Sequence, residues 1–235
     1  MRAHFIRAMI LAGGMGTRLR PLTFSIPKPL LPVGEKPILE RIIEQLRDAG
    51  IGDLVLATGY QAELIRAFCG DGSKFGVAIT YVHEHKPLGT AGPASALDRL
   101  IAPGELLLLM NGDLITDLDF KAFVESSRAS GCELSVAYAK HIYRSPYGVL
   151  SIKDGTVQGV TEKPETEYPI NAGIYCLSGA AIELIPKDTF FTMPDLMKSL
   201  LAAGKRIHAY PIAGTWMGLE SIEHFNEAVQ KLRQE

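Results

Sequence analysis

One stretch of the sequence decides which fold and function we expect: Leu11-Ala12-Gly13-Gly14-Met15-Gly16-Thr17-Arg18-Leu19-Arg20-Pro21. It continues an apolar run over residues 5–12 that is typical of a buried strand. Glycine lets the backbone adopt φ > 0 and approach a ligand closely, and successive N–H groups in such a turn can surround an anion. Arg18 and Arg20 add guanidinium donors that match phosphate oxygens. The stretch therefore predicts a loop that binds a nucleoside triphosphate.

The spacing of the glycines differs from two common nucleotide-binding fingerprints. The dinucleotide pattern G-x-G-x-x-G lacks its last glycine, because Gly14-x-Gly16 is followed by Arg18 and Leu19, and the P-loop pattern G-x-x-x-x-G-K-[ST] is absent. Lys28 adds a further cation on a stiff, proline-rich segment. These cations favour phosphate binding over a plain turn. A nicotinamide-dependent oxidoreductase is an alternative that rests on the glycine loop alone.

The composition indicates a globular protein whose affinity for phosphate is local. Of its 235 residues 47% are hydrophobic, and the formal net charge is −2. Without a basic excess we expect neither nucleic acid nor a membrane surface as a partner, and no apolar run approaches the roughly 20 residues of a membrane span. Three scattered cysteines, Cys69, Cys132 and Cys176, indicate reduced, mostly buried thiols. With no signal-peptide pattern at residues 1–4, we expect a cytoplasmic protein.

Apolar strands and helical patterns alternate along the chain. We expect strands at residues 5–12, 54–57, 77–82, 106–110, 134–139 and 206–212. We expect helices at 37–46, 63–68, 91–100, 118–129, 193–203 and 222–232. Asp154-Gly155 predicts a hairpin between 147–152 and 156–160. This alternation predicts an α/β fold with a mostly parallel central sheet flanked by helices. We treat 1–235 as one domain, with about 1–140 binding the nucleotide and about 141–235 forming a smaller acceptor-binding lobe.

Chemically active turns follow two of the predicted strands. Ligands of parallel sheets bind beyond the carboxyl ends of the strands, and both the glycine loop and Asn111-Gly112-Asp113 lie at such ends. Asp113 is a candidate ligand for Mg²⁺ between phosphate oxygens, the alternative being a simple turn aspartate. Lys163 can hold a second phosphate and Tyr147 can form a wall of the same pocket; a solvated turn and a strand-start aromatic are the alternatives.

Two other groups of residues are not expected to take part in the reaction. His83, Glu84 and His85 match no standard zinc spacing, so we do not expect a metal cluster there. Trp216 is expected to cover the core or the rim of the pocket.

The glycine stretch and five later motifs together resemble the sugar-1-phosphate nucleotidylyltransferase family. Within that family they most resemble the mannose- or heptose-1-phosphate guanylyltransferases. The later motifs, in family order, are Pro87-Leu88-Gly89-Thr90-Ala91-Gly92, Asn111-Gly112-Asp113, Tyr147-Gly148-Val149, Glu162-Lys163-Pro164 and Asn171-Ala172-Gly173-Ile174-Tyr175. They span nearly the whole chain, and the set is far more specific than any one motif.

The resemblance implies a reaction in which an NTP and a sugar 1-phosphate give an NDP-sugar and pyrophosphate, with Mg²⁺ as cofactor. It implies nucleotide binding by Leu11, Ala12, Gly13, Gly14, Gly16, Thr17, Arg18, Lys28, Gly89 and Asp113. It implies substrate binding by Tyr147, Gly148, Glu162, Lys163, Asn171 and Gly173. Arg18, Lys28, Asp113 and Lys163 would act in catalysis, with Asp113 holding the metal. GTP is the favoured nucleotide, with UTP, CTP or dTTP, or an unusual phosphorylated acceptor, as alternatives. Relatives commonly form homo-oligomers.

One departure from the family pattern affects the metal site. The family usually has Trp-x-Asp near the C-terminus, and its aspartate is the second metal ligand. Here Gly218 occupies that place in Trp216-Met217-Gly218. Loss of a carboxylate should weaken metal binding, unless Glu220 or Glu223 substitutes for it. An impaired, nucleotide-sugar-binding or regulatory protein is therefore a second hypothesis.

Overall fold

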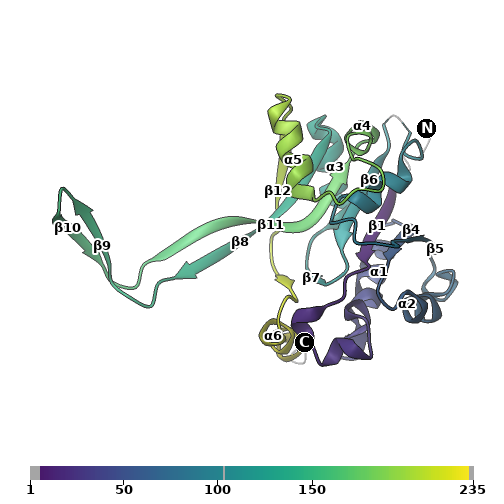
Figure 1. Ribbon diagram of the computed structural model, residues 1–235, viewed down its shortest axis with the longest axis horizontal. Helices are drawn as coiled ribbons and strands as arrows, with labels where there is room; N and C mark the ends of the chain where they lie inside the picture. Colours follow the sequence, from purple (N-terminus) through teal and green to yellow (C-terminus); the bar gives the residue numbers. More distant parts are fainter. Residues whose placement is uncertain (1–5, 103, 233–235) are drawn as a thin grey trace.

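The computed structural model describes residues 6–102 and 104–232, and its centre is a seven-stranded sheet (Figure 1). The strands lie in the order β12-β8-β11-β6-β1-β4-β5. Their bounds are β1 Ile6–Ala12, β4 Asp53–Thr58, β5 Ala78–His83, β6 Leu106–Asn111, β8 Leu134–Arg144, β11 Glu165–Leu177 and β12 Ile207–Pro211. Three short pairs complete the strands: β2 Pro32–Val33 with β3 Lys36–Pro37, β7 Leu114–Thr116 with β13 Trp216–Gly218, and β9 Val149–Lys153 with β10 Thr156–Thr161. The N-terminal edge of the first predicted strand, residue 5, lies outside the described residues.

The direction of the strands confirms the predicted mostly parallel sheet. Only β11 runs antiparallel to its neighbours in the described sheet, β6 and β8, and the other adjacent pairs are parallel. The chain leaves β1 toward β4 on one side and later returns to β6 on the other. This reversal creates a topological switch point at the carboxyl ends of β1 and β6, where α/β sheets bind ligands.

The helices confirm most of the predicted helical segments. The described α-helices are α1 Ile38–Asp48, α2 Ala62–Cys69, α3 Phe120–Ser130, α4 Gly179–Glu183, α5 Met193–Ala202 and α6 Ile222–Leu232. The short 3₁₀ helices are η1 Thr17–Leu19, η2 Leu22–Phe24, η3 Lys28–Leu30, η4 Ser73–Phe75 and η5 Gly92–Leu97. The short helix α4 was not predicted.

The α-helix predicted at 91–100 is wrong, because this segment forms the 3₁₀ helix η5. The carbonyl of Phe191 accepts hydrogen bonds from the N–H groups of both Ala91 and Gly92, each at 3.0 Å. Pro93 has no N–H to contribute to a helical ladder. The start of the segment is therefore held by a distant loop, and an α-helical ladder does not begin there.

Successive residues of β1 face two separate hydrophobic cores. Ala8 and Ile10 belong to the core that includes apolar side chains of α1, α3 and α6. Met9 belongs to the core on the other face, with η5, α4 and α5. All three side chains are fully buried. Burial on both faces is typical of parallel strands and explains the apolar runs at residues 8–12, 54–57 and 106–110 within β1, β4 and β6.

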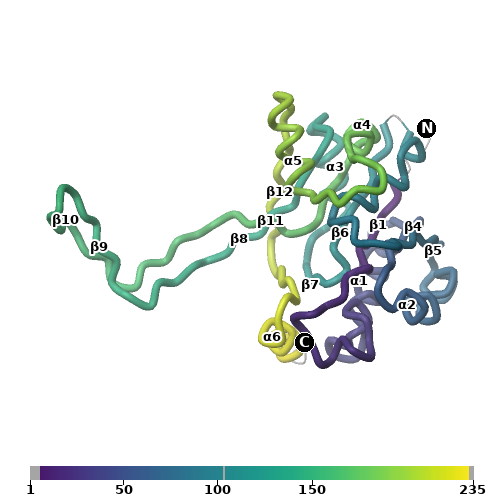
Figure 2. Tube along the Cα trace, viewed as in Figure 1, coloured from purple at the N-terminus to yellow at the C-terminus, as the bar shows by residue number. Residues whose placement is uncertain are grey.

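The second half of the chain contains a long projecting hairpin. β8 and β11 pair far beyond the sheet, from Tyr138↔Asn171 out to Arg144↔Glu165, and their outer ends lead into β9 and β10. The predicted Asp154-Gly155 hairpin is confirmed at the tip. Figure 2 shows this hairpin extending away from the rest of the chain. We call residues 140–169 the arm.

Two of the three cysteines are buried, as the composition indicated. Cys69, Cys132 and Cys176 are free, and the first and last are buried. Burial raises the pKa of the Cys69 thiol to about 11 and that of Cys176 to about 12. Thiols with such values are protonated at neutral pH and unreactive. Within residues 6–102 and 104–232, no helix combines the length and apolar character needed to cross a bilayer.

Replacing Gly112 should destabilise the junction between β1 and β6. A Cβ atom at Gly112 would lie 2.6 Å from the carbonyl oxygen of Leu11, so Gly112→Ala must push the two strand ends apart. We expect the free energy of unfolding to fall by about 1–3 kcal/mol, as for other overpacked sites, measured by urea denaturation. Gly52→Ala is the matched control, since its added methyl meets no atom within 4 Å. Equal effects of the two substitutions would contradict this explanation.

Candidate active site

The glycine loop and the Asn111-Gly112-Asp113 turn lie side by side. β1 and β6 pair in parallel with Leu11 opposite Asn111, and the N–H of Gly112 donates to the carbonyl of Leu11 at 2.9 Å. The two turns therefore leave the sheet at the same edge. The sequence predicted this juxtaposition from the order of strands and turns alone.

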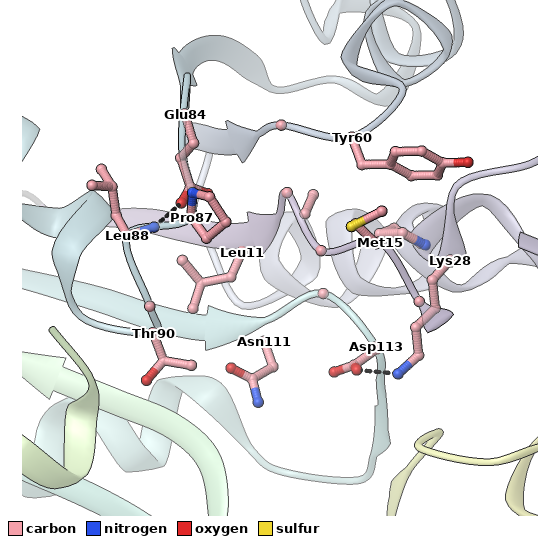
Figure 3. Close-up of a pocket in the computed structure, with 18 of the residues that line it drawn as sticks. Leu11, Met15, Lys28, Tyr60, Glu84, Pro87, Leu88, Thr90, Asn111 and Asp113 are labelled. Atoms are coloured by element: carbon pink, nitrogen blue, oxygen red, sulfur yellow. Dashed lines mark hydrogen bonds and ion pairs between the residues drawn. The ribbon is translucent and has the colours of Figure 1, made fainter. Parts of the chain in front are cut away.

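A cavity of about 770 Å³ opens at this edge (Figure 3). Eight of the ten predicted nucleotide-binding residues line it: Leu11, Ala12, Gly13, Gly14, Gly16, Lys28, Gly89 and Asp113. Figure 3 shows Glu84, Pro87 and Leu88 at one end and Lys28 with Asp113 at the other. Its size and its two different ends suit an elongated ligand with a flat apolar part and a charged part.

The glycine loop owes its turn to Gly16 and has open space at Gly14. Gly16 has φ +59°, and a Cβ there would lie 2.9 Å from Thr23 Cγ2. The hydroxyl of Thr23 donates to the carbonyl of Gly16 at 2.8 Å and fixes the turn. At Gly14 an added Cβ would meet nothing within 4 Å. The loop is therefore held from behind and leaves open space on its cavity side.

Lys28 and Asp113 form an ion pair at the charged end of the cavity. Lys28 begins the short helix η3, and Asp113 follows β6, so two elements far apart in sequence deliver the pair. Their side chains are 13% and 28% exposed, which is buried enough to strengthen the attraction and open enough to admit a ligand. Lys28 can pass from Asp113 to phosphate oxygens if a cation takes its place beside the carboxylate.

Thr17 and Arg18, the other two predicted nucleotide ligands, lie in η1 beside the cavity but do not line it. Arg18 is well exposed and donates to a carboxylate oxygen of Glu220 at 2.8 Å. An exposed ion pair of this kind contributes little to stability. It does hold the guanidinium of Arg18 toward the C-terminal segment that flanks the site.

A second cavity of about 380 Å³ adjoins the first and shares Thr90, Asn111 and Asp113 with it. Asn171 and Gly173, two predicted substrate-binding residues, line it. They lie where the register of β11 on β8 shifts between Asn171 and Tyr175. The Asn171 side chain accepts from the N–H of Gly173 at 3.0 Å, and Gly173 has φ +72°. This bulge shapes the wall of the second cavity.

Gly218 lies beside Asp113, where the family pattern places the second metal ligand. It pairs with Leu114 across β13 and β7, and the next N–H, that of Leu219, donates to the carbonyl of Asp113 at 3.0 Å. Glu220 lines the same cavity. Trp216 sits at the rim, as predicted, and its indole N–H donates to the carbonyl of Ala172 at 2.9 Å.

The structure does not bring Tyr147, Gly148, Glu162 and Lys163 to either cavity. All four belong to the arm, in the segments that join β8 to β9 and β10 to β11. Tyr147 is 76% exposed. They do lie together, since a Cβ at Gly148 would be 2.8 Å from Glu162 Oε2. The predicted sugar-phosphate residues are therefore split between the cavity and the arm.

Glu84 is a site residue that the sequence did not reveal. It follows β5, lines the large cavity and accepts a hydrogen bond from the N–H of Leu88 at 3.2 Å. Its other oxygen lies where a Cβ at Gly13 would be only 2.6 Å away, so Gly13 makes room for it. Burial raises the pKa of Glu84, opposed by that hydrogen bond. The only sequence signal was its place between two histidines just ahead of the Pro87-Leu88-Gly89 turn.

The turn after Glu84 is anchored to the start of α5. Gly89 has φ +78°, and a Cβ there would lie 2.6 Å from the carbonyl oxygen of Phe191. The hydroxyl of Thr90 accepts from the N–H of Met193, the first residue of α5, at 2.9 Å. Residues 89–92 are therefore fixed by a segment about a hundred positions away.

Comparison with known proteins identifies the family. A family model described as "Nucleotidyl transferase" matches residues 7–235. The chain belongs to this family. The fold is of the nucleotide-diphospho-sugar transferase type that its structural neighbours share.

Individual relatives of this nucleotidyl transferase are similar over most of its length. The mannose-1-phosphate guanylyltransferase catalytic subunit beta of Drosophila pseudoobscura pseudoobscura is 38% identical over 224 residues, which cover 93% of this chain and 60% of the relative. Mannose-1-phosphate guanylyltransferase 1 of Arabidopsis thaliana is 38% identical over 222 residues, covering 91% and 61%. The chain thus spans about three fifths of the length of these curated relatives. The crystal structure of HddC from Yersinia pseudotuberculosis complexed with GMP-PN matches with a TM-score of 0.74 and 28% identity, covering 96% of this chain and 99% of HddC.

Nucleotidyl transferases of this family generally use a divalent metal. Here Asp113 and Glu220 are the carboxylates of the smaller cavity. In the described part of the chain, no three His, Cys, Asp or Glu side chains gather closely enough to hold an ion alone. The donor set therefore fits a hard cation that takes one or two carboxylates from the protein and its remaining ligands from phosphate oxygens and water.

Removing the charge of Glu84 should change stability in a pH-dependent way. A carboxyl whose pKa is higher in the folded state binds more protons when folded, so stability falls as pH rises from its ordinary 4.5 through the raised value. Glu84→Gln keeps an acceptor for the Leu88 N–H without this cost. We expect the variant to be more stable than the wild type at pH 7, with the difference shrinking toward pH 4, in urea denaturation. A difference independent of pH would contradict the assignment.

Proposed function

We propose that this chain transfers a nucleotidyl group from an NTP, with GTP favoured, to a sugar 1-phosphate, releasing pyrophosphate. The observation that carries the proposal is the paired turn at the ends of β1 and β6, which combines an open glycine loop, Lys28 and Asp113 at one end of a nucleotide-sized cavity. The guanylyltransferase names of the relatives support the same activity. We further propose that residues 1–140 bind the nucleotide and 141–235 the acceptor, in a cytoplasmic protein.

In the proposed reaction an oxygen of the sugar phosphate attacks the α-phosphorus of the NTP. The bond from the α-phosphorus to the bridging oxygen breaks, and pyrophosphate leaves. The attacking group is already an anion, so no strong base is required. The task of the protein is to hold two polyanions in line and to offset their charge. The glycine loop N–H groups and Lys28 would bind the triphosphate, and Arg18 would turn from Glu220 toward the departing pyrophosphate.

We propose Mg²⁺ as the cation, held by Asp113 and assisted by Glu220. When bound, it would neutralise charge on the phosphate oxygens around the α-phosphorus. Lys28, which is paired with Asp113, lies close enough to bind the same phosphates as a cation on that carboxylate. Asn171 and Gly173 then orient the sugar phosphate from the neighbouring cavity.

Glu84 supports guanine as the favoured base. Guanine presents two adjacent donors, N1–H and the exocyclic amine, on one edge, whereas adenine and cytosine present a donor next to an acceptor. A carboxylate accepts from both donors at once. Glu84 lies at the end of the cavity opposite Lys28 (Figure 3), at the position that a base would occupy if the phosphates lie on the glycine loop.

A matrix of nucleotides and sugars tests the activity and the base together. GTP, UTP, CTP, dTTP and ATP are combined with mannose, heptose, glucose and galactose 1-phosphates, and pyrophosphate release is measured with saturating Mg²⁺. We expect GTP with mannose or heptose 1-phosphate to be best, and Glu84→Gln to lower the preference for GTP over ATP by roughly 10- to 100-fold. No release with any pair would overturn the proposed activity. An unchanged preference in the variant would overturn the role of Glu84.

A nucleotide-sugar-binding or regulatory protein is the second candidate function, and Gly218 is the observation that favours it. A Cβ at Gly218 would lie 3.3 Å from the Trp216 ring, so an aspartate can be introduced there with a small adjustment of the indole. The two functions differ in what a restored carboxylate does. An enzyme gains metal affinity, whereas a binding protein gains turnover that it lacked.

Gly218→Asp should lower the Mg²⁺ concentration needed for half-maximal pyrophosphate release by roughly tenfold, since it adds an anionic ligand beside Asp113. Gly218→Asn is the matched control, because it has the same size without the charge. Equal effects of Asp and Asn would show that the change is steric. Release that appears only in Gly218→Asp would support the second function.

A further inference from the structure

The arm exposes an unusual amount of apolar surface. Every residue of β9 and β10 is exposed. Within the described residues, nine of the eighteen large exposed hydrophobic side chains lie in the arm. They are Ile142, Tyr143, Tyr147, Val149, Leu150, Ile152, Val157, Val160 and Tyr168. An isolated two-stranded ribbon is at best marginally stable in water, so this surface calls for a covering partner.

One face of the ribbon at the tip of the arm is continuously apolar. Ile152 pairs with Val157, and Leu150 pairs with Val160 across the strands, with the irregularity at Gln158 keeping both pairs on the same side. The opposite face carries Val149 and otherwise polar or small side chains. An antiparallel ribbon with this alternation normally packs its apolar face on a core. Within the described chain nothing covers this face.

The second cavity, which we call the acceptor cavity, lacks a basic side chain, whereas the arm carries one in Lys163. Its described lining contains the carboxylates of Asp113 and Glu220 and no lysine or arginine. The nearby cations, Lys28 and Arg18, are paired with those same carboxylates. A sugar phosphate entering this cavity therefore needs positive charge from elsewhere. Lys163 on the arm has no carboxylate within ion-pair distance among the described residues.

The backbone at Lys163 points to a functional position. Lys163 has φ +44°, in the left-handed region that non-glycine residues seldom adopt. Such conformations cost of order 1–3 kcal/mol and cluster at sites of function. Here the bend lies next to Glu162 and close to Gly148, so a basic, an acidic and a polar aromatic group gather on an arm that reaches no cavity of its own chain.

We propose that the arm of one chain closes the acceptor cavity of a second copy of this chain, placing Lys163 against the sugar phosphate. This rests on the proposed function for the identity of the acceptor. The arm starts at the Asn171–Tyr175 bulge, which itself lines the acceptor cavity. Two chains related by a two-fold axis can therefore exchange arms reciprocally, each arm crossing from its own cavity to that of the partner.

The body of the chain offers apolar surface for the exchanged arm. Leu22, Phe24 and Ile26 are exposed on the segment between the glycine loop and Lys28. Met15 is exposed on the glycine loop itself. Met15 lines the large cavity, and the other three side chains lie on the chain segment that connects it to Lys28, so an arm that reaches the site can contact this segment. Because arm and body patches belong to the same chain, a second copy satisfies both at once.

The oligomeric state tests the apolar contact independently of catalysis. We expect the wild type to sediment as a dimer at micromolar concentration and Leu150→Lys with Ile152→Lys to sediment as a monomer. Val149→Lys is the matched control, since Val149 is 48% exposed against 51% for Leu150 but lies on the other face. A monomeric wild type, or a dimer that survives the double substitution, would overturn the proposal. Since all three positions are exposed, loss of folding is not expected, and circular dichroism verifies it.

Heterodimers of inactive chains test whether the arm acts in the partner's site. Lys28→Ala and Lys163→Ala chains carrying different tags are co-expressed, and the heterodimer is purified through both tags. If the arms are exchanged, the body of the Lys163→Ala chain receives the arm of the Lys28→Ala chain, and this site carries neither substitution. About half of the wild-type rate of pyrophosphate release should then return. The converse heterodimer, a wild-type chain with a chain bearing both substitutions, should show only background activity.

If each arm served its own chain, the two heterodimers would show the opposite pattern, and the proposal would fail. A wild type that dimerises through the arm but releases no pyrophosphate would refute the proposed function while leaving the arm contact in place. A fully active Lys163→Ala chain would refute the placement of Lys163 at the acceptor.

Discussion

The parallel pairing of β1 with β6 is the constraint on which the site depends. It aligns Leu11 with Asn111, and the hydrogen bond from Gly112 to Leu11 joins the two turns that follow. Both strands are buried on both faces, so neither can shift without disturbing two cores. The glycine loop and Asp113 therefore start from a rigid base, although each is itself partly exposed.

Charge compensation organises the rest of the site. Each carboxylate that lines the acceptor cavity is matched by a cation from the N-terminal segment: Asp113 by Lys28 and Glu220 by Arg18. Neither pair is fully buried, so both can open at modest cost when phosphates arrive. Such an arrangement keeps a site that binds polyanions free of uncompensated charge in their absence. When phosphates bind, Lys28 and Arg18 therefore exchange a carboxylate partner for a phosphate partner, so the net gain in charge interactions is smaller than the number of new contacts.

The sequence predicted the sheet, most helices and the meeting of the glycine loop with Asp113, because apolar strands followed by polar turns determine where side chains meet. Gly89 lines the same cavity, but it was expected there only from the family resemblance. Glu84 was missed, since a single glutamate has no periodicity or spacing to mark it. The direction of the arm was not predicted either. It depends on the bulge between Asn171 and Tyr175, whose register is set by pairing and not by local sequence, so Tyr147 and Lys163 lie away from the cavity of their own chain.

The anchoring of residues 89–92 to the start of α5 has a consequence for selectivity. Thr90 receives the N–H of Met193, and the carbonyl of Phe191 binds Ala91 and Gly92. The wall next to the proposed base position is thus built from residues 89–92 together with residues 191–193, about a hundred positions later in the chain. Residues just before α5 therefore help to set the position of that wall, and Phe190 also lines the cavity itself. Engineering of base choice should then begin in the loop before α5 as well as among the residues that face the cavity. The hydrogen bond that caps the start of α5 also fixes the position of the turn that forms this wall.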